Sequence, residues 1–434
     1  MKKIIYIFTF LIQFGIAQIQ ENFPPGIHLE PIQNIFLTRT VFPIFETESS
    51  RVDFQYIIPQ NFLIYTRYTD TSYKAQCEIT LEIKSKNTNR TEVRKIQIRE
   101  FFLNEPPKDE NSYFKGIFSF NLKNGKYQII FEVRDKESSR IFVDNKKEFE
   151  IPEVNNNISD LFFLQYCDTL SLISSRIYNM AYGEAIPFNS SFIAYVELNS
   201  NYFQNLNLVI ELFEIIENQK NKIITDQHFK LVKSYKLVPL VDSLYYSFER
   251  DEKYTGLLIF FPYKSLRIGD YELVLKFQQD KEPIKRNFQI KWINMPKSLK
   301  NFRLAIDLLE YIATPEEIRE MKVLNPKSVK EKFETFWKKL DPTPETVYNE
   351  AMAEYYKRAD YANEQFGTLK GDLGAKTDRG KIYILYGEPA NIERIILPRT
   401  TPKEIWTYKN LSKKFIFEDK NFDGSYKLIR IETL

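Results

Sequence analysis

The sequence predicts a multidomain protein in which two tandem β-sandwiches precede an α+β C-terminal domain, itself a helical half plus a small antiparallel sheet. Three observations carry this prediction. A short motif occurs twice, about one domain length apart. The residues around both copies alternate between apolar and polar, as β-strands do. Beyond Pro296 the apolar period changes to that of a helix. A chain of 434 residues also exceeds what one hydrophobic core usually holds.

The repeated motif reads L-x-x-G-x-Y and ends at Tyr127 and at Tyr271, which are 271 − 127 = 144 residues apart. It resembles the tyrosine corner of immunoglobulin-like and fibronectin-like sandwiches. In that corner a glycine permits the sharp turn and a buried tyrosine hydroxyl bonds back to the backbone. The alternative is two unrelated hairpin turns that happen to match.

The two sandwiches are expected over residues 22–152 and 160–294, joined by a short linker that contains three consecutive asparagines. Candidate strands of the first are 52–58, 63–68, 76–83, 95–99, 114–120, 128–133 and 147–151. Candidate strands of the second are 161–167, 192–198, 208–215, 229–235, 257–261, 272–277 and 287–292. Each is enriched in β-branched and aromatic residues or alternates with period two.

The C-terminal domain is expected over residues 296–434. Ser298 is placed to cap a first helix, and Thr314 with Glu317 forms a capping box before a second. Two further helices are expected over 327–340 and 344–366, because apolar residues recur there every three to four positions. Strands are expected at 381–386, 405–408, 414–417 and 426–431.

The N-terminus predicts export. Lys2 and Lys3 precede an apolar run over 4–16, and small residues end that run. This pattern is typical of a secretory signal peptide, residues 1–17, cleaved after Ala17. The alternatives are a buried N-terminal helix and an uncleaved anchor. No later stretch is long and apolar enough for a transmembrane segment, so a periplasmic or secreted protein is expected.

The only cysteines, Cys77 and Cys167, fall in different predicted domains. Two buried, unpaired thiols are therefore expected, and a disulfide between them is the alternative.

The last third of the chain contains a turn-rich motif over residues 374–380, an apolar segment over 381–386, and Gly387-Glu388-Pro389. Together with Tyr356, Arg358 and Asp360 upstream and Trp406 and 415–419 downstream, it resembles the GWxTD-domain proteins of bacteria. Their activity is not established. This chain has Ala375 where the family motif has tryptophan, and the alternatives are a lost function of that indole and a harmless repacking.

The motif supplies the candidate binding residues, which are Asp360, Lys376, Thr377, Asp378, Arg379 and Glu388. One interpretation is a polar site at the mouth of the expected 381–386 strand. The other is structural: Thr377 and Asp378 bond the turn backbone, and Arg379 pairs with a helix carboxylate such as Asp360.

Residues 419–424 match the first half of a calcium-binding loop, with Asp419, Asn421 and Asp423 as candidate ligands. The twelfth position holds Arg430 instead of the required glutamate, and strands are expected on both sides. The alternative is a hairpin turn at Asp423-Gly424, and no metal is expected.

Several function classes are disfavoured. Residues 374–377 lack the glycines of a phosphate-binding loop, and a strand is expected where that loop requires a helix. The only histidines, His28 and His228, lie outside the C-terminal domain, which disfavours a Ser-His-Asp site or a histidine-rich zinc site there. With 61 basic and 58 acidic residues, the charge balance disfavours nucleic acid as a partner.

The sequence therefore favours a non-catalytic, exported cell-envelope protein without a cofactor. It is expected to be a binding or scaffold protein that recognises a protein partner or a glycan. The alternative is a carboxylate-dependent envelope hydrolase with its site around residues 360–388, where Asp360, Asp372, Asp378 and Glu388 are available.

Overall fold

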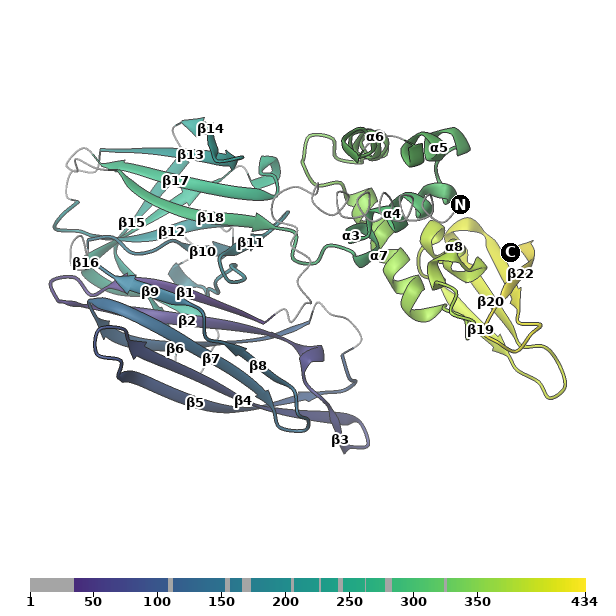
Figure 1. Ribbon diagram of the computed structural model, residues 1–434, viewed down its shortest axis with the longest axis horizontal. Helices are drawn as coiled ribbons and strands as arrows, with labels where there is room; N and C mark the ends of the chain where they lie inside the picture. The colour runs from purple at the N-terminus through teal and green to yellow at the C-terminus, as the bar shows by residue number, and fades with distance from the viewer. Residues whose placement is uncertain are drawn as a thin grey trace, which may run out of the picture. The chain divides into compact units, whose positions relative to one another are not determined.

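The computed structural model describes residues 35–107, 112–152, 157–165, 173–203, 207–225, 228–240, 245–261, 263–277, 283–323 and 326–434. The expected signal peptide and Cys167 lie outside these residues. The described chain is mostly β and divides into two compact units, up to Ile293 and from Asn294 to Leu434 (Figure 1). None of its helices is long and apolar enough to cross a membrane.

The first part of the β unit contains two antiparallel sheets that pack face to face. Sheet A has the strand order β1-β2-β6, formed by Phe36–Pro43, Ser49–Pro59 and Tyr113–Lys123. Sheet B contains β3 (Thr66–Thr69), β4 (Ser72–Ser85), β5 (Thr91–Leu103), β7 (Gly125–Asp135), β8 (Ile141–Asp144) and β9 (Glu148–Ile151). Their facing side chains form one apolar cluster that includes Phe54, Leu81 and Phe131.

The second part also contains two sheets that pack face to face, antiparallel except for one parallel pair at the edge of sheet D. Sheet C has the order β10-β12-β16-β15, formed by Phe162–Gln165, Phe192–Asn199, Tyr246–Phe260 and His228–Pro239. Sheet D has the order β11-β18-β17-β13-β14, formed by Ala185–Pro187, Ile284–Lys291, Gly269–Phe277, Leu208–Ile216 and Gln219–Thr225. A second apolar cluster, with Leu198, Leu257 and Leu273, fills the space between them.

The two tyrosines of the repeated motif occupy equivalent positions. The Tyr127 hydroxyl donates to the Lys123 carbonyl at 2.7 Å, and the Tyr271 hydroxyl donates to the Arg267 carbonyl at 2.8 Å. Both side chains are buried, and each begins its strand next to a turn. The repeat therefore marks a shared local structure in both sheet pairs.

A third apolar cluster joins the two sheet pairs through the outer faces of sheets A and C. It contains Phe42 of β1, Ile193 and Tyr195 of β12, and Tyr246 of β16. The β unit is therefore built of four stacked sheets in the order B, A, C, D (Figure 1). The two central strands β2 and β12 are buried on both faces.

A polar network lies within this central layer. Arg51 and Asp53 of β2 form an ion pair at 3.1 Å, and Ser119 donates to Asp53 at 2.6 Å. Across the layer, the Glu197 carboxylate accepts the Leu237 amide at 2.5 Å and the Tyr195 hydroxyl at 3.2 Å. Charges this deeply buried persist only when they are paired or hydrogen bonded.

The C-terminal unit combines helices with a four-stranded antiparallel sheet. The helices are α3 (Lys297–Lys300), α4 (Phe302–Leu308), α5 (Pro315–Val323), α6 (Pro326–Lys339), α7 (Glu350–Gln365) and α8 (Asp378–Tyr386). The sheet has the order β19-β20-β21-β22, formed by Asn391–Ile395, Lys403–Tyr408, Lys413–Glu418 and Lys427–Thr433. Trp406 and Phe417 are fully buried on its inner face.

Two features of this unit correct the sequence prediction. The segment 381–386 is not a strand but the body of helix α8. Ser298 does not cap a helix with its side chain, since Pro296 precedes α3 and Asn301 caps α4. The capping box is confirmed, because the Thr314 amide donates to Glu317 and the Glu317 amide donates to Thr314.

The buried network gives the β unit a pH-dependent stability. Burial raises the pKa of Glu197 from 4.5 to about 7, against the opposing effect of Arg51. The fold therefore favours the protonated acid. The contribution of protonated Glu197 to the free energy of unfolding is complete below pH 4.5, and it disappears as the pH rises through about 7. Burial also raises the pKa of Asp53, which adds an effect of the same sign.

We expect the free energy of unfolding of the β unit to fall by about 2–3 kcal/mol between about pH 5 and pH 8. Glu197→Gln should remove most of this slope, because the amide does not titrate. Urea unfolding across that pH range measures it, with the exposed Glu249→Gln on the same sheet as control. An unchanged slope in Glu197→Gln would contradict the assignment.

Candidate functional site

The motif region forms a tight junction between α7, the 3-10 turn at Gly374–Lys376 and α8. Thr377 is the N-cap of α8: its hydroxyl accepts the Gly380 amide at 3.1 Å and donates to the Gly374 carbonyl at 2.8 Å. The two glycines let backbones approach closely. A Cβ on Gly374 would lie 1.9 Å from the Ala362 carbonyl oxygen, and one on Gly380 would lie 1.9 Å from that of Gly374.

Arg379 fixes this junction to the sheet. Its guanidinium pairs with Glu404 of β20 at 3.3 Å and donates to the Gly424 carbonyl at 3.2 Å. It also lies over the rings of Phe366 and Tyr426. Glu404 accepts a further bond from the Trp406 indole at 3.1 Å. The arginine is 8% exposed, so these contacts account for its position as a buried structural cation.

The other candidate residues bond to separate parts of the unit. Asp378 accepts the Leu428 amide of β22 at 2.8 Å. Asp360 accepts the amides of Lys297 and Ser298 at 2.5 and 2.7 Å, at the start of α3. Lys376 pairs with Glu310 at 2.7 Å.

Glu388 is exposed just after α8, near Tyr383, whose pKa is raised mainly by burial and further by Tyr361 and Glu388. Thr377 hydrogen bonds the backbone of the turn, as the structural interpretation predicts. The partner proposed for Arg379 was wrong, because it is Glu404 rather than Asp360. The structure does not bring the six residues into one cluster.

The 419–424 segment forms a turn in which aspartate side chains accept hydrogen bonds from nearby backbone amides. Asp419 accepts the Gly424 amide at 2.8 Å, and Asp423 accepts the Ser425 amide at 3.0 Å. The remaining Asp423 oxygen pairs with Lys370 at 2.7 Å. These bonds lower the pKa of Asp423, with Lys370 as the largest cause. In the described part of the chain, no three His, Cys, Asp or Glu side chains are grouped to hold a metal ion, and Asn421 has no such group around it.

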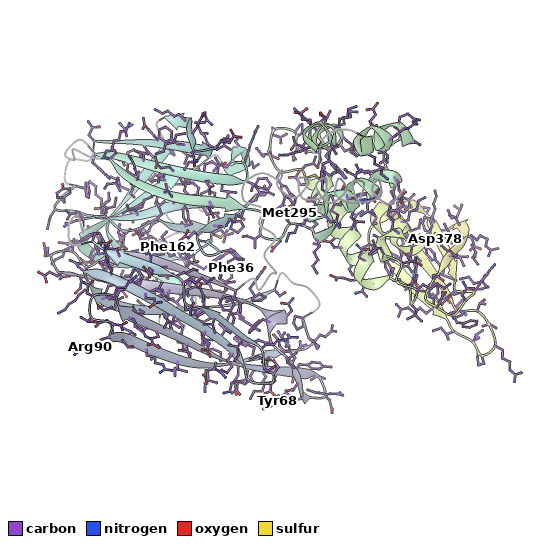
Figure 2. All side chains as sticks on the ribbon, in the orientation of Figure 1. Phe36, Tyr68, Arg90, Phe162, Met295 and Asp378 are labelled. Atoms are coloured by element: carbon purple, nitrogen blue, oxygen red, sulfur yellow. The ribbon has the colours of Figure 1, made fainter. Side chains whose placement is uncertain are left out.

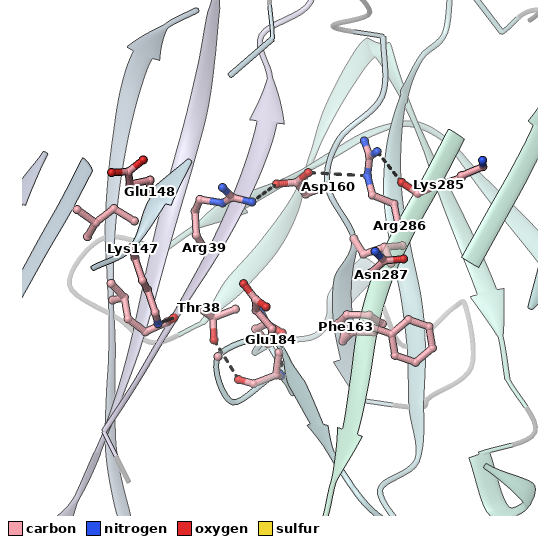
Figure 3. A pocket seen from close by; sticks show the side chains of 17 residues that line it. Thr38, Arg39, Lys147, Glu148, Asp160, Phe163, Glu184, Lys285, Arg286 and Asn287 are labelled. Atoms are coloured by element: carbon pink, nitrogen blue, oxygen red, sulfur yellow. Dashed lines mark hydrogen bonds and ion pairs between the residues drawn. The ribbon is translucent and has the colours of Figure 1, made fainter. Parts of the chain in front are cut away.

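A pocket of about 300 Å³ lies in the β unit, at the edge where the two sheet pairs meet. Figure 3 shows its polar wall, with Arg39 of β1 and Arg286 of β18 on opposite sides of Asp160. The Arg39 guanidinium is 3.6 Å from the Asp160 carboxylate, and the Arg286 Nε is 3.8 Å from it. Asp160 also accepts the Val41 amide at 3.1 Å.

Lys147 and Glu148, which also line this pocket, have ion-pair partners outside it. Lys147 donates to the Leu37 carbonyl at 3.1 Å and pairs with Asp144 at 3.5 Å. Glu148 pairs with Lys86 at 2.6 Å. Sequence reasoning missed the pocket because residues 39, 160 and 286 come from a strand, a linker and a second strand. No local motif connects them.

The chain thus combines a four-sheet β unit with an α+β domain organised by a glycine-rich helix junction. Residues 274–434 match the family model of the GWxTD domain. The match confirms the resemblance seen in the motif, and the chain carries a GWxTD domain in its C-terminal part. No curated protein matches this chain.

The close backbone approach at the junction predicts a severe effect of one methyl group. Gly380→Ala should destabilise the C-terminal unit by at least about 3 kcal/mol, because its Cβ meets a backbone oxygen that cannot move aside. Gly367→Ala is the matched control, since its Cβ would meet nothing nearer than 3.6 Å. Thermal unfolding of both variants measures this, and equal stabilities would contradict it.

Asp378 should matter through its hydrogen bond. Asp378→Ala is expected to cost about 1–3 kcal/mol in unfolding free energy, because the Leu428 amide loses its acceptor. Asp378→Asn keeps an acceptor oxygen and should cost less. Urea unfolding compares the two, and a larger loss in the asparagine variant would argue against this role.

Proposed function

We propose that this chain is an exported, non-catalytic binding or scaffold protein of the bacterial cell envelope. Two immunoglobulin-like or fibronectin-like sandwiches, residues 22–152 and 160–294, would support the C-terminal domain. That domain would recognise the partner. The equivalent hydrogen bonds of Tyr127 and Tyr271 support the sandwich assignment, because they match a tyrosine corner in each sheet pair. The signal-peptide pattern before Ala17 supports export.

The observation that carries the recognition proposal is an exposed apolar patch on the GWxTD domain, formed by Leu369 and Phe422. Leu369 is 87% exposed and Phe422 is 63% exposed. The Leu369 amide donates to the Asp423 carbonyl at 3.0 Å, so the two side chains project from adjoining backbone. Large apolar side chains presented together on a surface are typical of protein interaction sites.

The backbone that carries Leu369 and Phe422 is held in place by polar contacts, which suits the patch to binding a partner. The Lys370–Asp423 ion pair joins the two loops next to the exposed side chains, and Arg379 bonds the Gly424 carbonyl from below. A preorganised surface loses less conformational entropy on binding. Neither Leu369 nor Phe422 offers a hydrogen-bonding group to the hydroxyls of a glycan, so the patch favours a protein partner.

The competing function is a hydrolase with its site around residues 360–388. Against it, Asp360 accepts two backbone amides with its two oxygens, and Asp378 accepts a third from β22. Carboxylates engaged in this way hold elements together, whereas a glycosidase pair flanks an open substrate site.

Replacing both patch residues, as Leu369→Ser with Phe422→Ser, should lower partner retention at least tenfold. Each apolar side chain is worth about 1.5–3 kcal/mol when buried. The measurement is affinity enrichment from envelope extract on immobilised residues 18–434, quantified by mass spectrometry. The control is Tyr68→Ser, an aromatic that is 61% exposed in the β unit.

The proposal requires one protein that the wild type and the control both retain and that the double variant loses. Retention unaffected by the double variant would overturn the patch. Turnover of an envelope glycan that both Asp378→Asn and Asp378→Ala abolish would replace the proposal with the hydrolase.

A further inference from the structure

We propose that the pocket between the two sheet pairs is a second binding site, specific for a small hydroxylated carboxylate of the sugar-acid class. The ligand carboxylate would lie against the guanidiniums of Arg39 and Arg286. This site belongs to the β unit and is independent of the apolar patch on the GWxTD domain.

The two arginines have unused hydrogen-bonding capacity. Each approaches Asp160 only at 3.6–3.8 Å, which is beyond hydrogen-bond length. The Nε atoms of both arginines are buried and make no hydrogen bond within the described part of the chain. Buried donors normally have partners, and an unsatisfied one is costly. One carboxylate therefore serves two cations here, and a second would satisfy both.

The planar geometry of the guanidinium group favours a carboxylate as the bound anion. Its planar set of donors matches a carboxylate in two parallel hydrogen bonds. Arg286 is already oriented, because its terminal nitrogens donate to the carbonyls of Lys285 and Ser159 at 3.1 and 3.3 Å. The Arg39 guanidinium is held over the Phe149 ring at 5.2 Å. Both cations are thus positioned before a ligand arrives.

The other polar residues that line the pocket favour a ligand with hydroxyl groups. The side chains of Glu184 and Asn287 make no hydrogen bond or ion pair with the described residues, and both line the pocket. Figure 3 labels Glu184 and Asn287 among the side chains that line the pocket with Arg39 and Arg286. A free carboxylate repels a second acid group but accepts hydrogen bonds from hydroxyls. A ligand with one carboxylate and several hydroxyls meets both requirements.

The volume of the pocket and its apolar lining fit a ligand the size of one sugar ring. The volume of about 300 Å³ lies at the lower end of the range for small-molecule sites, about 300–1,000 Å³. Leu161, Phe163 and Phe288 contribute apolar surface, against which the C–H face of a sugar ring can pack. A long oligosaccharide would exceed this volume.

The alternative interpretation is that Arg39, Asp160 and Arg286 only clamp the sheet pairs together. The two interpretations predict opposite outcomes for Asp160→Asn. Asparagine still accepts the Val41 amide but no longer competes for the guanidiniums. A binding site would gain affinity for an external carboxylate, and a clamp would only lose stability.

The experiment is isothermal titration calorimetry of residues 18–434 with D-glucuronate as the probe. D-glucose tests the need for the carboxylate, inorganic phosphate tests for unspecific anion binding, and alanine tests for an amino-acid ligand. We expect glucuronate binding at least tenfold tighter than binding of any of the three. Arg286→Gln and Arg39→Gln should each weaken it at least tenfold, and Asp160→Asn should strengthen it at least threefold.

Arg90→Gln is the matched control, because Arg90 is exposed on the turn between β4 and β5, away from the pocket lining (Figure 2). It should bind like the wild type. Thermal unfolding checks that each variant is folded, and if the Arg39 or Arg286 variant does not fold, Asp160→Asn alone decides. No glucuronate binding to the wild type, tighter binding of phosphate or alanine, or no gain in a folded Asp160→Asn would overturn the proposal. None of these results bears on the Leu369 and Phe422 patch.

Discussion

The burial of charge between strands β2 and β12 is the constraint on which the β unit depends. Arg51, Asp53 and Glu197 lie in a largely apolar layer that also buries Ser50 and Gln55, and Asp53 and Glu197 are each 1% exposed. Removing these groups from water costs free energy, and their hydrogen bonds and ion pair offset part of that cost. Between the two sheets, Arg51 interacts electrostatically with Glu197, and Tyr246 of β16 hydrogen bonds Asp53, so these side chains match one arrangement of sheet A on sheet C. The network thus specifies how the two sheet pairs pack, whereas the surrounding apolar side chains supply the driving force.

The same junction explains why the pocket exists. The four sheets pack tightly where β2 faces β12, but the edge formed by β1, the linker and β18 lacks an apolar seal. Asp160 and its two arginines occupy that edge instead. Polar side chains with long, incomplete contacts leave space that close-packed apolar residues would fill. The contact between sheets A and C therefore explains both the specific packing at its centre and the accessible polar edge beside it.

Local rules predicted from sequence the elements whose structure is local. The tyrosine motif and the Thr314 capping box each depend on residues within a few positions, and both were identified from the sequence. The sequence analysis did not predict the burial of Arg51, Asp53 and Gln55, because polar residues that alternate along a strand are typical of a solvated face. Their burial depends on a partner sheet more than one hundred residues away. The pocket was invisible for the same reason, since its polar residues meet only when both sheet pairs are packed.

Helix α8 shows how tertiary contacts overrule propensity. Its segment from Lys381 to Tyr386 is β-branched and aromatic, and isolated helices of nine residues are marginal in water. Three contacts nevertheless impose the helix: the Thr377 cap, the backbone contact at Gly380, and the Arg379–Glu404 pair.

Ala375 lies inside the same junction and is fully buried. Its amide donates to Asn363, and its carbonyl accepts the Tyr311 hydroxyl. The backbone at this position is thus fixed by neighbouring side chains. The Ala375 side chain thus lies inside a closed junction and has no exposed surface.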